Sequence, residues 1–87
     1  MTDTQNMKLS DFNAMMESVD YKERFKAEYY QLKIRYQKLH KMLVQYEAGT
    51  LSFTPSCQID LLRRQKAAMG QYLYALEVRS EIEGVQL

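Results

Sequence analysis

The sequence predicts an all-α protein in which a short N-terminal helix is followed by a long antiparallel helical hairpin that oligomerises through its helix faces. Three observations indicate this fold class. Apolar residues recur at alternating steps of four and three between positions 25 and 46, which is the spacing of a helix packed lengthwise against another helix. Glycine and proline are absent between positions 21 and 47. A second apolar stripe with helical spacing follows between positions 61 and 82.

The first long helix is expected over about residues 21–47. Asp20 suits the N-cap position, and Gly49 is placed to end the helix in a left-handed conformation. Aromatic side chains occupy four of its seven seam positions, where a plain coiled coil carries leucine and isoleucine. The seam consists of Phe25, Tyr29, Leu32, Tyr36, Leu39, Leu43 and Tyr46.

The second long helix is expected over about residues 55–83. Thr54 and Pro55 suit the N-cap and the first helical position, and Gly84 is placed to end the helix. Its apolar stripe is too wide to pack against one helix, so we expect the first helix on one flank and a second subunit on the other. The stripe consists of Leu61, Leu62, Ala68, Met69, Tyr72, Leu73, Ala75, Leu76 and Ile82.

Ahead of the hairpin, residues 1–8 are polar and are interpreted as a flexible tail. The amphipathic spacing that follows predicts a short helix over about residues 9–19, too short to be stable unless it docks on other structure. With 87 residues the chain has room for one small core, so residues 9–87 are interpreted as a single helical domain. Small helical domains commonly gain stability by self-association, which also favours a homo-oligomer.

Several function classes find no support in the composition. Cys57 is the only cysteine and His40 the only histidine, so neither a disulfide framework nor a metal site is expected. The sequence contains no phosphate-binding glycine loop and no hydrolase or metalloprotease motif, and we expect a protein that is not an enzyme and uses no cofactor. No signal peptide and no stretch of about 18 apolar residues is visible, so a cytoplasmic protein without a membrane partner is expected.

The net charge is only +1, but the charges are unevenly distributed. In an antiparallel hairpin, basic residues gather toward the loop and acidic residues toward the opposite end. This basic end, with its interleaved tyrosines, could bind a phosphate-bearing ligand, or its charges could be solvated while the tyrosines pack. Duplex DNA is not favoured, because a helix-turn-helix needs shorter helices and one continuous recognition face. The basic residues are Lys33, Arg35, Lys38, Lys41, Arg63, Arg64 and Lys66.

Two segments of the chain resemble the helical hairpin of phage anti-CBASS and anti-Thoeris sponge proteins and of related crAss-like phage proteins. They read YKERFKAEYYQLKIRYQKLHKML and, later, LLRRQKAAMGQYLYALEVRSEI. The resemblance covers about residues 20–83. It implies an anti-defence protein in the cytoplasm of an infected bacterium, a homo-oligomer and commonly a hexamer. Such sponges sequester cyclic di- or trinucleotide messengers without cleaving them.

The same resemblance implies a set of ligand-binding residues. Lys33 falls where the family places a phosphate-binding lysine, and Arg79 falls at or near an arginine used at an inter-subunit pocket. Tyr29 and Tyr36 flank Lys33, and we expect them to lie near the surface as one wall of such a pocket. The Gly-Tyr-Arg element that precedes the first long helix in many anti-CBASS sponges is absent, and Tyr21 is the nearest aromatic substitute.

Two other functions remain open from the residues themselves. A small protein-binding inhibitor, of the anti-CRISPR or host-regulator type, would use the wide apolar face of the second helix against a foreign protein. A structural coiled-coil assembly factor would oligomerise and bind no nucleotide. Arg79 is open as well, because it could pair with Glu83 on its own helix instead of contacting a ligand.

Overall fold

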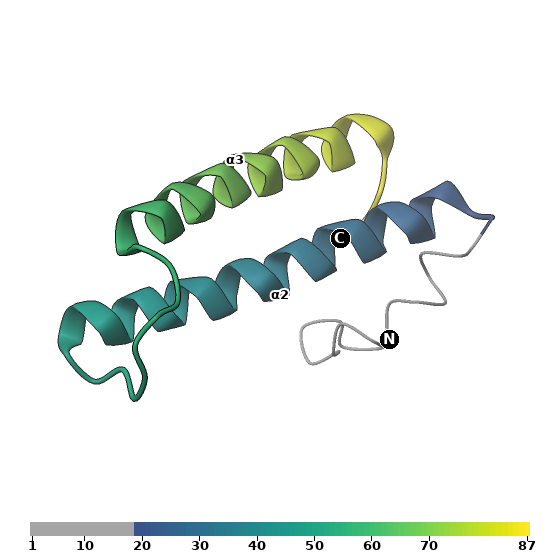
Figure 1. The fold of residues 1–87 in the computed structure, drawn as a ribbon. Coiled ribbons are helices and arrows are strands. Elements are labelled where there is room, and N and C mark those ends of the chain that lie inside the picture. The colour runs from purple at the N-terminus through teal and green to yellow at the C-terminus, as the bar shows by residue number, and fades with distance from the viewer. Residues whose placement is uncertain (1–18) are drawn as a thin grey trace.

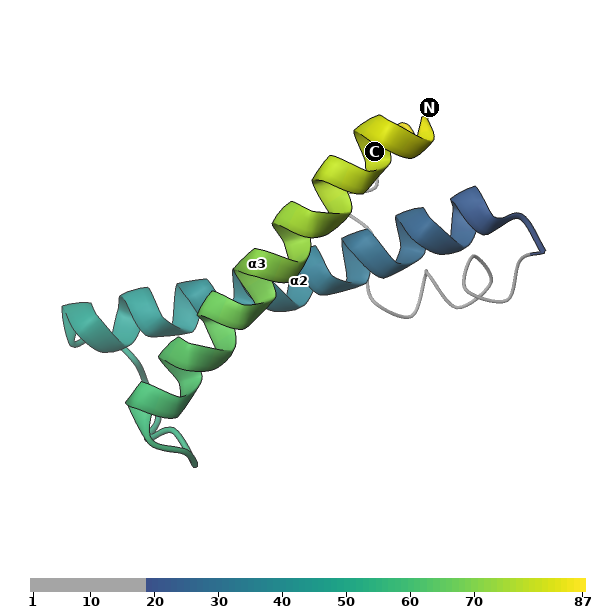
Figure 2. The ribbon, with the colours of Figure 1, turned by 90° about the horizontal axis from the view of Figure 1, so that it is seen from above.

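The described part of the computed structural model, residues 19–87, consists of two helices, α2 (Tyr21–Ala48) and α3 (Ile59–Glu83). The helices run in opposite directions and pack against each other as a hairpin (Figure 1), so the predicted all-α hairpin is confirmed. Seen from above, they cross at a clear angle instead of lying parallel along their length (Figure 2). The predicted tail and almost all of the predicted N-terminal helix fall on residues 1–18, outside the described residues.

The limits of α2 follow from the residues predicted to set them. The Asp20 carboxylate accepts a hydrogen bond from the backbone N–H of Lys22 at 2.9 Å, as an N-cap residue does. At the other end Gly49 takes a left-handed conformation with φ of 78°, and its N–H donates to the carbonyl of Tyr46 at 3.1 Å. Both assignments are therefore confirmed.

The start of α3 was predicted too early. The helix begins at Ile59 with Gln58 as its N-cap, and the backbone N–H groups of Leu61 and Leu62 donate to the Gln58 carbonyl. Pro55 instead belongs to the loop, where it is half-buried and lines a small pocket together with Tyr46. Proline is tolerated in the first helical turn but also occurs in loops, so Pro55 by itself does not fix the residue at which α3 begins.

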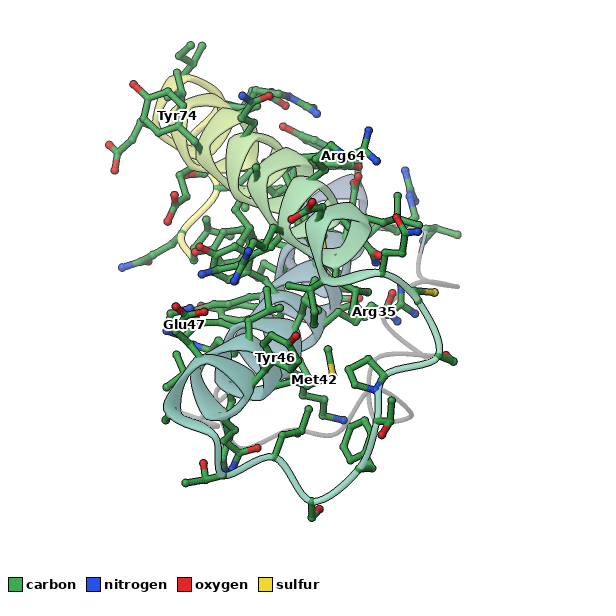
Figure 3. All side chains as sticks on the ribbon, turned by 60° about the vertical axis from the view of Figure 1, so that its left-hand side comes forward. Arg35, Met42, Tyr46, Glu47, Arg64 and Tyr74 are labelled. Carbon is green, nitrogen blue, oxygen red and sulfur yellow. The ribbon has the colours of Figure 1, made fainter. Side chains whose placement is uncertain are left out.

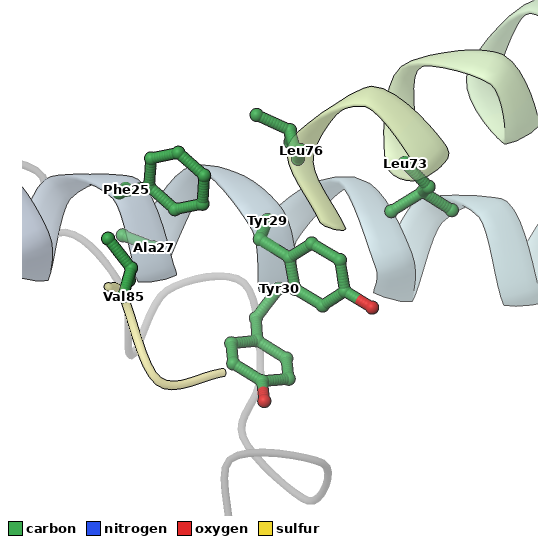
Figure 4. Packing of buried hydrophobic residues seen from close by; sticks show 7 residues of the cluster. All are labelled: Phe25, Ala27, Tyr29, Tyr30, Leu73, Leu76 and Val85. Carbon is green, nitrogen blue, oxygen red and sulfur yellow. The ribbon is translucent and has the colours of Figure 1, made fainter. Parts of the chain in front are cut away.

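The core lies toward the open end of the hairpin, away from the loop (Figure 4). Phe25 from α2 and Leu73 and Leu76 from α3 pack together there. Beyond α3 the chain turns at Gly84 (φ of 70°) and brings Val85 back onto α2, where it is buried. The first turns of α2 are therefore covered by α3 and by the C-terminal segment. The complete cluster is Phe25, Ala27, Tyr29, Tyr30, Leu73, Leu76 and Val85.

Two glycine substitutions are expected to change stability in opposite directions. Gly49→Ala should lower the free energy of unfolding by about 1 kcal/mol, because a Cβ is disfavoured at positive φ. Gly70→Ala should raise it by up to about 1 kcal/mol, because alanine is the better helix former. A Cβ on Gly70 would lie 3.5 Å from Cε2 of Tyr36, an ordinary van der Waals contact. Urea denaturation measures both changes, and a clear loss of stability in Gly70→Ala would contradict the packing described here.

Candidate functional site

A groove of about 790 Å³ runs between α2 and α3 in the loop half of the hairpin. It opens on the flank that carries Tyr74 and Glu47, whereas Arg35 and Arg64 project from the opposite flank (Figure 3). The groove is of a size that small-molecule sites commonly have. Its lining residues are Tyr36, Leu43, Val44, Glu47, Arg63, Lys66, Ala67, Gly70, Gln71 and Tyr74.

The groove combines an apolar lining with aromatic rings. Leu43 and Val44 line it from α2, and Ala67 lines it from α3. Gly70 leaves room for the Tyr36 ring, whose Cε2 comes within ordinary contact distance of the position a Cβ would take. Tyr74 is exposed at the α3 side of the groove. An aromatic ring from each helix therefore lines the groove.

Positive charge stands beside this aromatic surface. The Lys66 ammonium lies 5.8 Å from the centre of the Tyr36 ring, and among residues 19–87 it takes part in no ion pair. The His40 imidazole stacks on the same ring, with centroids 6.4 Å apart and planes at 8°. Arg63 is engaged already, because its guanidinium pairs with Glu47 at 2.9 Å and with Asp60 at 3.6 Å. Lys66 is therefore the cation best placed to receive a phosphate.

Tyr29 and Lys33 lie outside this groove. Tyr29 is only 5% exposed, so the expectation that it lies near the surface is wrong. Its hydroxyl donates to Oε2 of Glu77 at 2.9 Å, which ties α2 to α3. Its ring packs edge-on against Tyr30 with centroids 5.0 Å apart, and the Lys33 ammonium lies 5.8 Å and 5.9 Å from the two ring centres. The register of the helices thus turns Tyr29 inward, where it holds Lys33 in place.

Tyr21 and Arg79 meet at the open end of the hairpin. The Tyr21 hydroxyl donates to Oε1 of Glu83 at 2.7 Å, and Nε of Arg79 donates to Oε2 of the same carboxylate at 2.7 Å. Arg79 and then Tyr21 stabilise the charged form and lower the pKa of Glu83. The Arg79 guanidinium also lies 5.0 Å from the centre of the Phe25 ring. Arg79 therefore makes the intrahelical pair that the sequence left open.

The structure divides the five predicted ligand-binding residues into three places. Of these five, only Tyr36 lines the groove, while Tyr29 with Lys33 and Tyr21 with Arg79 form separate clusters nearer the open end. The sequence placed Lys66 in the basic end without pairing it with Tyr36, and Tyr74 was missed. Their four-residue spacing around Gly70 was a usable signal, because it places all three on one flank of α3.

Tyrosine hydroxyls join the two helices repeatedly. Besides the bonds of Tyr21 and Tyr29, the Tyr72 hydroxyl on α3 donates to the Glu28 carboxylate on α2. Because the bonds of Tyr21 and Tyr29 need a neutral phenol, and both phenols have a raised pKa, these two contacts make the free energy of unfolding depend on pH in the alkaline range.

Stability is expected to fall as the pH rises above 10. Burial, followed by the hydrogen bond to Glu77, raises the pKa of Tyr29 well above its ordinary value of 10.0. A group with a raised pKa contributes its full stability below the pKa of the unfolded chain and loses it as the pH rises toward the folded value. Tyr29→Phe should therefore flatten the decline between about pH 10 and 12. Urea midpoints across this range measure the effect, and an equally steep decline in the variant would contradict it.

Residues 19–87 contain no cluster of histidine, cysteine and carboxylate side chains that could hold a metal ion. Neither α2 nor α3 is long and apolar enough to cross a lipid bilayer.

Comparison with known proteins gives one match. A family model described as Sequestin matches residues 19–82, which include all of α2, the loop and almost all of α3. No curated protein and no solved structure matches the chain.

Proposed function

Because the chain belongs to the Sequestin family, we propose that it binds and sequesters cyclic oligonucleotide messengers of bacterial defence without cleaving them. Membership confirms the predicted resemblance to a family of sequestering proteins, and the family name describes sequestration instead of catalysis. The proposed ligands are cyclic di- or trinucleotides of the CBASS or Thoeris type. The proposed setting is a phage protein in the cytoplasm of an infected bacterium.

The observation that carries this proposal is the groove beside Tyr36. Tyr36 and Tyr74 offer aromatic faces to nucleobases, and stacking on such faces is worth about 1–3 kcal/mol per base in nucleic-acid complexes. Lys66, free of ion pairs within the described hairpin, offers a charge to a phosphate. An apolar lining with a few polar groups at its edge is typical of small-molecule sites.

The four predicted ligand-binding residues that do not line the groove are assigned to contacts between subunits in this proposal. Lys33 is half-buried above two tyrosine rings, and Tyr21 and Arg79 converge on Glu83. We place these residues at boundaries between copies of a homo-oligomer, with a hexamer as the expected assembly. Tyr29 would act through Lys33, because its ring packs below the ammonium group.

Titration calorimetry tests the proposal without knowledge of the exact ligand. The full chain is titrated with a panel of cyclic dinucleotides, cyclic trinucleotides and cyclic ADP-ribose isomers. We expect saturable heat with at least one member of the panel at micromolar protein. Absence of heat with every member would overturn the proposal.

A second candidate function is inhibition of a foreign protein, such as a nuclease or a host regulator. The observation in its favour is the set of exposed apolar side chains on α3, of which Ile82 is 78% exposed. Light scattering separates the candidates, because an inhibitor of this kind would be a monomer that binds no nucleotide, whereas the proposed sponge is an oligomer.

A further inference from the structure

The outward side of α3 forms an apolar face along most of the helix. Positions 67, 71, 74, 78 and 82 follow one another at steps of three and four, so they lie on one side of the helix, with position 75 beside them. Every one of these residues is exposed, and none is charged at neutral pH. We call this set the α3 face: Ala67, Gln71, Tyr74, Ala75, Val78 and Ile82.

The spacing of the α3 face suits packing against another helix that has a similar apolar face. The steps of four and three that line the α3 face also occur at helix–helix seams. Ala67 and Ala75 have small side chains that allow another helix to approach closely. The face is not the side of α3 that packs on α2, which carries Leu73 and Leu76. Three of its residues, Ala67, Gln71 and Tyr74, also line the groove, so a second copy on the face would border the groove as well.

The charges flanking the face point to a second copy in a particular orientation. Basic residues flank the first third of α3, where Arg63 and Arg64 stand, and acidic residues flank the last third, where Glu77 and Glu81 stand. A parallel partner would set like charges against each other. An antiparallel partner sets the basic third of one helix against the acidic third of the other.

The spacing of two of these residues defines the register. Arg63 and Glu81 are separated by about five helical turns at 3.6 residues per turn, so they lie on the same line along α3. When a second α3 is laid antiparallel with its centre near position 72, Arg63 of each copy comes opposite Glu81 of the other. The same register brings Ala67 of one copy to within one residue of the level of Val78 of the other, a small residue near a larger one.

We propose that two copies of this chain pair antiparallel through the α3 face, with Arg63 of one copy, which also pairs with Glu47 and Asp60 of its own chain, beside Glu81 of its partner at both ends of the contact. This inference rests on the homo-oligomer of the proposed function but not on its ligand. Larger assemblies, including a hexamer, would be built from such pairs.

Val78→Arg tests the face, and Val19→Arg is its matched control. Val78 is 41% exposed and lies outside the groove, while Val19 is 98% exposed and belongs neither to the groove lining nor to the α3 face. Light scattering without nucleotide should give the wild type a mass that is an even multiple of 10.3 kDa. We expect Val78→Arg to reduce this mass by at least half and Val19→Arg to leave it unchanged. A monomeric wild type, or equal masses for wild type and Val78→Arg, would overturn the inference.

A charge exchange tests the orientation. Arg63→Glu and Glu81→Arg should each weaken association at least tenfold, because each places like charges opposite one another in the antiparallel pair. The double variant should recover association to within a few-fold of the wild type. Circular dichroism verifies that each variant remains helical. A double variant no better than either single variant would overturn the antiparallel register, and neither outcome depends on whether a nucleotide binds.

Discussion

Replacement of Lys66 by glutamate is expected to weaken the binding of a cyclic di- or trinucleotide at least tenfold. The Lys66 ammonium lies 5.8 Å from the centre of the Tyr36 ring, so it can reach the phosphate of a ligand whose base stacks on that ring. The substitution removes one charge-assisted hydrogen bond and places a carboxylate near the phosphates. Calorimetric titration with the member of the panel that binds the wild type most tightly measures the loss.

Lys38→Glu is the matched control for this experiment. Lys38 is exposed on α2 and does not line the groove. Because both variants replace a lysine by a glutamate, they have the same net charge. We expect Lys38→Glu to change affinity less than threefold at 0.15 M salt, because exposed charges beyond about 8 Å are largely screened. Equal losses in the two variants would show that general electrostatics, and not the groove, binds the ligand.

Leu76→Ala is expected to lower the free energy of unfolding by about 2–5 kcal/mol. Leu76 is only 2% exposed and packs in the cluster that joins α3 to the first turns of α2. A domain of this size has a total stability on the order of 3–10 kcal/mol, so the variant should be partly or wholly unfolded at 37 °C. Thermal unfolding followed by circular dichroism at one fixed protein concentration measures the change.

Leu61→Ala provides the comparison, because Leu61 lies on the same helix and is 48% exposed. It should cost less than about 1 kcal/mol, since little of its side chain leaves water on folding. A loss in Leu61→Ala as large as that in Leu76→Ala would contradict the assignment of the core to the open end of the hairpin.

The helical fold could be predicted because its signals are local. Asp20, Gly49 and Gly84 each set a helix limit through their own backbone or side-chain chemistry, and the structure places them in these roles. The start of α3 could not be predicted in the same way. Pro55 is compatible with either a first helical turn or a loop, and in the structure it lies in the loop, where it lines a small pocket with Tyr46.

The candidate site was harder to predict because it depends on how two helices cross. Tyr36 and Lys66 are 30 positions apart, and only the register of the hairpin brings the ammonium over the ring. The same register turns Tyr29 toward Glu77 and into the core. Helical periodicity places both tyrosines on one seam, but it does not distinguish a tyrosine within the core from one at the edge of a groove.

The most direct test of sequestration without cleavage is to capture the ligand and release it again. The protein is incubated with the best-bound cyclic oligonucleotide, free ligand is removed by filtration, and the retained protein is heat-denatured. Mass spectrometry then identifies what is released. We predict intact cyclic oligonucleotide in a constant ratio to protein, with that ratio reduced in Lys66→Glu but not in Lys38→Glu. Release of a linear or hydrolysed product, or retention of no ligand at all, would contradict the proposed function.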